Sequence, residues 1–118
     1  MNRRERGRQA ESRALRHLEN NGLTLLCSNY RSRRGEIDLV MQDHDSLVFV
    51  EVRYRHSPHY GSPAESVDRN KQARLIACAQ HYLLTHPQSA QRPCRFDVVS
   101  VNGNTGTLDW IRHAFVAE

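Results

Sequence analysis

The chain has 118 residues and a mass of 13.7 kDa, the size of one domain with a modest core. Apolar residues make up 38% of it and charged residues 25%, which excludes an intrinsically disordered chain. The formal net charge is +4, and the 17 basic residues include one lysine, Lys71, which leaves 16 arginines. Arginine binds phosphate through paired hydrogen bonds, so this excess favours a polyanionic partner, although a genome that prefers arginine codons gives the same composition.

Cysteine usage and hydropathy narrow the class of protein further. Cys27, Cys78 and Cys94 are odd in number and widely spaced, so neither a disulfide scaffold nor a zinc site is predicted. A reducing cytoplasm is the expected location. No run of about 18 apolar residues exists, so we expect no membrane span. Residues 1–6 are basic but precede no apolar segment, and we interpret them as a flexible tail rather than a signal peptide.

Hydrophobic periodicity predicts seven elements in one domain over residues 1–118. Apolar residues at helical spacing predict a helix over 5–21, ended by Gly22. The later elements are strands at 23–30, 36–42 and 47–54, a loop at 56–63, a helix at 64–84, and strands at 95–101 and 107–115. The order α-β-β-β-α-β-β predicts an α/β fold with a mixed sheet of about five strands flanked by helices.

Two carboxylates interrupt the most apolar part of the predicted hairpin. A tight turn at 43–46 sets a register in which Asp38 faces Glu51 and Glu36 faces Arg53, all four on one side of the sheet. Directly opposed Cβ atoms lie roughly 5 Å apart, so the two carboxylates repel each other, and burial raises the cost. A divalent cation such as Mg²⁺ relieves both penalties, because it takes oxygen ligands.

An alternative is that Asp38 and Glu51 form ordinary ion pairs with arginines such as Arg34 or Arg53. The apolar residues on both sides of each carboxylate count against it, because such a run is typical of a strand covered on both faces.

Glu11 is a third candidate carboxylate. It precedes Ala14, Leu15 and Leu18 by three, four and seven positions, which places it on the core-facing stripe of the first helix. The alternative is an exposed residue paired with a neighbouring arginine such as Arg8. Glu11 joins the candidate site only if this helix packs beside the hairpin.

Several motifs together resemble those of a known family. They are GxxxE at 7–11, RGEIDLV at 34–40, FVEVRYR at 49–55, YGSPAESVDRNKQARL at 60–75 and RFDVVSV at 95–101. This set resembles the YraN-like family of small bacterial proteins. That family is similar to the Holliday-junction-resolvase members of the PD-(D/E)XK nuclease superfamily. The resemblance implies a restriction-endonuclease-like core.

The resemblance implies roles for particular residues. Asp38 matches the first strand carboxylate of the superfamily, Glu51 the acid of its (D/E)xK triplet, and Glu11 the helix glutamate of resolvase-like members. Val52 would offer its backbone carbonyl to the metal. Together these four imply a site for Mg²⁺ or Mn²⁺. Arg53 stands where the triplet has lysine, so the sequence departs from the pattern there.

An arginine in place of the triplet lysine limits the chemistry that is possible at position 53. Lysine can lose its proton when desolvated, whereas arginine in practice cannot, so Arg53 is able to steady a phosphate but not to act as a base. Either the metal alone activates water, or the site is inactive, or Lys71 returns an ammonium to the site from the second helix. The alternative is that Lys71 is a solvated helix residue or contacts the DNA backbone. Glu36 belongs to the motif but has no assigned role.

Further basic residues are candidate nucleic-acid contacts. Arg31, Arg33 and Arg34 precede the Asp38 strand and, with Lys71, suit contact with phosphates, unless they form an ordinary solvated turn. The predicted function is DNA binding with metal-dependent endonuclease activity, at branched structures and as a homodimer by analogy with resolvases. The alternatives are a DNA-binding module that retains the nuclease fold without turnover, and an interaction protein whose carboxylates are ion pairs.

Overall fold

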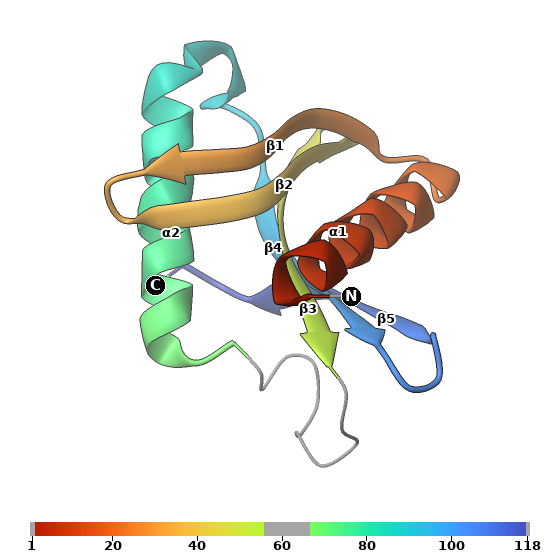
Figure 1. Ribbon diagram of the computed structural model, residues 1–118. Coiled ribbons are helices and arrows are strands. Elements are labelled where there is room, and N and C mark those ends of the chain that lie inside the picture. Colours follow the sequence, from red (N-terminus) through yellow and green to blue (C-terminus); the bar gives the residue numbers. More distant parts are fainter. Residues whose placement is uncertain (1, 56–66, 118) are drawn as a thin grey trace.

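A mixed five-stranded sheet with one helix on each face forms the protein (Figure 1). The computed structural model describes residues 2–55 and 67–117. The elements are α1 (Arg3–Asn20), β1 (Thr24–Ser32), β2 (Gly35–Asp43), β3 (Ser46–Arg55), α2 (Arg69–Thr85), the 3-10 helix η2 (Pro87–Ser89), β4 (Cys94–Asn102) and β5 (Leu108–Phe115). The predicted element order and the mixed sheet are therefore confirmed. Among the described residues, no helix has the length and apolar character needed to cross a bilayer.

The strands lie across the sheet in chain order, β1-β2-β3-β4-β5. Every neighbouring pair is antiparallel except β3 and β4, which run parallel. A parallel pair needs a crossover connection, and the segment that contains α2 provides it. Because α2 follows β3 in the chain, its first turn lies near the C-terminal end of β3.

Side-chain capping sets where both helices begin. The Asn2 side chain accepts a hydrogen bond from the Glu5 backbone N–H at 2.9 Å, so α1 starts at Arg3 and includes most of the stretch expected as a tail. Asp68 caps α2 in the same way, so this helix starts at Arg69, later than the predicted residue 64. The predicted loop at 56–63 and the first part of the predicted helix lie outside the described residues.

Two apolar clusters, one on each face of the sheet, form the core. The α2 side contains Ile37, Val40, Leu47, Phe49, Leu75, Cys78, Ala79, Tyr82, Phe96 and Val98 among others. The α1 side contains Ala14, Leu18, Leu23, Leu39, Met41, Val48, Val50 and Val99. Successive residues of β3 alternate between the two clusters, as a strand covered on both faces requires. This burial explains the continuous apolar runs around the candidate carboxylates.

Asp97 on β4 is a fully buried carboxylate with a structural role. It accepts hydrogen bonds from Trp110 Nε1 at 2.9 Å, from the His113 backbone N–H at 3.0 Å and from Arg95 Nε at 3.1 Å. His113 has a positive φ of 53° where the pairing of β4 with β5 is irregular. Asp97 therefore holds the bulged edge strand β5 onto the sheet.

We expect Asp97→Asn to lower the free energy of unfolding by about 2 kcal/mol, because one donor loses an acceptor and Arg95 loses a buried partner. Urea titration followed by circular dichroism measures the change. The matched control is Asp109→Asn, which removes an exposed carboxylate from β5. Equal stability of the two variants would contradict a structural role for Asp97.

Candidate functional site

Strands β2 and β3 separate where the candidate carboxylates stand. Their ladder has the predicted register from the turn up to the pair Leu39–Val50, which confirms the hairpin to that point. Beyond it, residues 35–37 pair only with β1, and residues 51–55 pair only with β4. The two cross-strand pairs predicted next, Asp38 with Glu51 and Glu36 with Arg53, are therefore not ladder partners. The predicted geometry was wrong there, because the strands diverge.

A side chain bridges the gap that the diverging strands leave. The Val52 backbone N–H donates to Asp38 Oδ2 at 2.8 Å, so the carboxylate replaces the carbonyl of a missing β2 partner. The N–H and C=O of one strand residue point to the same edge of the strand. The Val52 carbonyl therefore faces the same gap as the Asp38 carboxylate.

The two strand carboxylates are neighbours despite the divergence. Glu51 is only 5% exposed. Burial, followed by the negative charge of Glu51, raises the pKa of Asp38 to about 8, although the hydrogen bond from Val52 opposes this shift. Without a cation between them, Asp38 thus holds a proton at neutral pH.

Two basic side chains flank Glu51. Lys71 Nζ lies 3.5 Å and Arg53 Nε 3.6 Å from Glu51 Oε2. Lys71 belongs to the first turn of α2, where its backbone N–H donates to the capping Asp68 side chain at 2.8 Å. The crossover therefore brings the single lysine to the strand carboxylates. Its side chain is 30% exposed, so a solvent-borne substrate can still reach it.

Asn29 connects Glu11 to Glu36. With its amide nitrogen turned toward the carboxylates, Asn29 donates to Glu36 Oε1 at 2.8 Å and to Glu11 Oε1 at 3.1 Å. Asn29 has a φ of 53°, a left-handed conformation that asparagine tolerates better than most residues. Burial and the charges of Asp38 and Glu36 raise the pKa of Glu11, while the bond from Asn29 lowers it. Arg31 Nε pairs with Glu36 Oε2 at 3.2 Å.

Sequence reasoning missed this part of the site. It gave Glu36 no role and did not single out Asn29. The only sequence signal was an asparagine within a predicted strand, where this residue type is uncommon and often marks an irregularity.

The residues present fit a magnesium-type ion. Among residues 2–55 and 67–117, no three His, Cys, Asp or Glu side chains are close enough to enclose an ion, so Glu11 does not complete such a set with the strand carboxylates. Mg²⁺ commonly takes one or two carboxylates and completes its shell with water and substrate oxygens. Asp38, Glu51 and the Val52 carbonyl suit that pattern.

The predicted arginine contacts lie at the β1–β2 turn. Arg31, Arg33 and Arg34 line a shallow hollow that extends to Glu36, and all three arginines are exposed. The ion pair between Arg31 and Glu36 connects this hollow to the acidic site. The basic turn therefore borders the part of the site around Glu36.

The fold and the site define a small α/β protein in which two strand carboxylates meet at a divergence, beside a lysine from the crossover helix. The uncharacterised protein family UPF0102 matches residues 10–101, and the chain belongs to this family. A UPF0102 protein of Xylella fastidiosa strain 9a5c is 55% identical over 98% of this chain and 95% of its own. One from Pseudomonas fluorescens Pf-5 is 49% identical over 92% and 91%. These matches confirm the resemblance to the YraN-like family.

Proposed function

We propose that this protein binds DNA and hydrolyses its phosphodiester bonds with the help of Mg²⁺ or Mn²⁺, preferentially at branched structures. The observation that carries the proposal is the contact between the Asp38 and Glu51 carboxylates. Holding two such groups together away from water costs free energy, and a divalent cation offsets that cost. A site that is strained without a cation supports a role in metal binding.

Each residue of the site has a task in this proposal. Asp38, Glu51 and the Val52 carbonyl hold the ion. The bound ion supplies a Lewis acid for the scissile phosphate and a water of lowered pKa. Arg53 keeps its proton and stabilises negative charge on the phosphate. Lys71 is the group that can exchange a proton with the attacking water, because a lysine can deprotonate when desolvated.

Cleavage assays test the proposal directly. Purified protein is incubated with a four-way DNA junction and with a linear duplex, in Mn²⁺ or in EDTA, beside Asp38→Asn. We expect metal-dependent cutting, faster on the junction, and at least about a hundredfold less cutting by the variant. Paired cuts on opposite strands of the junction would support action as a homodimer. Cutting in EDTA, or undiminished cutting by Asp38→Asn, would refute the proposal.

Arg53 favours a second candidate function, a DNA-binding module without turnover. Such a module binds DNA with strong salt dependence, because bound arginines displace counterions from phosphates, yet cuts neither substrate in Mn²⁺. The same assays, read for binding as well as for cutting, separate the two functions. If the protein neither binds nor cuts DNA, the ion pairs of Glu51 with Arg53 and Lys71 have a purely structural role.

A further inference from the structure

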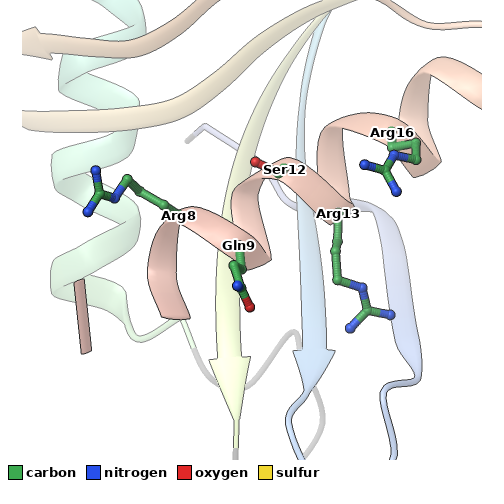
Figure 2. A pocket seen from close by; sticks show the side chains of 5 residues that line it. All are labelled: Arg8, Gln9, Ser12, Arg13 and Arg16. Carbon is green, nitrogen blue, oxygen red and sulfur yellow. The ribbon is translucent and has the colours of Figure 1, made fainter. Parts of the chain in front are cut away.

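A row of basic and polar side chains follows the outward surface of α1. Figure 2 shows Arg8, Gln9, Ser12, Arg13 and Arg16 succeeding one another along the helix, where they line a shallow hollow. On a helical wheel these five positions fall within an arc of about 140°. Each carries a hydrogen-bond donor, and none carries a negative charge. The hollow is therefore suited to an anion.

Two arginines of this row are available to bind an anion. Among the described residues, neither Arg8 nor Arg16 takes part in an ion pair, and both are exposed. Arg13 donates to the Gly106 carbonyl, which directs its side chain toward the β4–β5 turn. The acidic residues on the same arc, Glu5 and Glu19, lie in the first and last turns, outside the row.

The row is long enough to contact several phosphates of one strand. Eight residues separate Arg8 from Arg16, a distance of about 12 Å along the helix. One strand of a duplex presents a phosphate for roughly every 3.4 Å of axis, so the row spans about three phosphates.

The chemistry of α1 favours nucleic acid over a lipid surface. An amphipathic helix that binds membranes inserts its apolar face into the lipid. The apolar face of α1 is already used, because Ala10, Ala14 and Leu18 are buried against the sheet. Large exposed apolar side chains among the described residues, such as Leu84 on α2, lie elsewhere.

We propose that Arg8, Arg13 and Arg16 form a track that binds consecutive phosphates of one nucleic-acid strand. The inference rests on the proposed function for its choice of DNA as the polyanion. The track contacts phosphates and not bases, so it contributes affinity without sequence preference.

The test is DNA binding by the double variant Arg8→Gln/Arg16→Gln, compared with Arg74→Gln/Arg92→Gln. Both variants lose two positive charges, but the second pair lies away from α1. Fluorescence anisotropy with a labelled duplex, in EDTA and from about 50 to 200 mM salt, measures affinity and its salt dependence. We expect the α1 variant to bind about tenfold more weakly, with a log–log salt slope shallower by about two. The control variant keeps the wild-type slope.

The outcomes separate this inference from the proposed function. Equal losses in both double variants, or no loss in either, overturn the track. The track is also overturned if the wild type does not bind DNA but binds vesicles of phosphatidylglycerol and phosphatidylcholine in a way that depends on Arg8. A wild type that cuts DNA while the Arg8→Gln/Arg16→Gln protein binds and cuts normally refutes the track alone. If the protein binds DNA through the α1 arginines but does not cut it, the nuclease activity is refuted and the track is supported.

Discussion

Replacement of Lys71 by methionine is expected to slow metal-dependent DNA cleavage by about a hundredfold or more, the usual contribution of a positioned acid or base. The arginine in the triplet position, Arg53, cannot release a proton, and Lys71 is the single lysine in the chain. Its Nζ lies 3.5 Å from Glu51 Oε2, within the candidate site. Single-turnover cleavage of the junction in Mn²⁺ measures the loss.

Lys71→Arg is the matched control for charge. It retains a cation beside Glu51 but cannot deprotonate near neutral pH, so we expect it to fold and bind DNA like the wild type and still cut slowly. Anisotropy in EDTA measures binding separately from cutting. Full activity of Lys71→Arg would show that only the positive charge matters, and full activity of Lys71→Met would remove Lys71 from the mechanism.

Asp38→Asn is expected to stabilise the metal-free protein at pH 8. The Asp38 carboxyl of the unfolded chain loses its proton near pH 3.8, whereas burial and the charge of Glu51 raise its pKa in the folded chain to about 8. The folded state therefore binds more protons between these values, and the free energy of unfolding of the wild type falls as the pH rises from about 4 to 8. The stabilising contribution of protonated Asp38 is complete below pH 4 and is lost as the pH passes 8.

The free energy of unfolding of the variant does not fall in this way as the pH rises, because its side-chain amide is neutral. The amide oxygen can still accept the hydrogen bond from the Val52 N–H. Each pKa unit corresponds to about 1.4 kcal/mol, so the variant gains at most on the order of 5 kcal/mol over the wild type at pH 8, and nothing at pH 4. Thermal melts in EDTA across this pH range measure the difference. Mg²⁺ should then raise the melting temperature of the wild type alone. A constant difference across the range would contradict the burial of a strained carboxylate.

Local sequence patterns were sufficient for most of the fold. The alternation of apolar residues and the turn at 43–46 predicted the β2–β3 hairpin and its register correctly as far as Leu39–Val50. Capping determined the helix starts, and the cues were present in Asn2 and Asp68, each of which accepts a bond from a backbone N–H three residues on. These features depend on residues close together in the chain, which a sequence displays directly.

The sequence by itself determined the α/β fold, the family and the candidate carboxylates Asp38 and Glu51, because those follow from periodicity and from motifs. Only the tertiary structure decided that β2 leaves β3 at these carboxylates, that Lys71 reaches Glu51, and that Asn29 ties Glu11 to the site. Each of these contacts joins segments far apart in the chain. Their geometry depends on the divergence of two strands, on a crossover and on the left-handed backbone of Asn29, which arise from the packing of the whole domain and leave no periodic trace in the sequence.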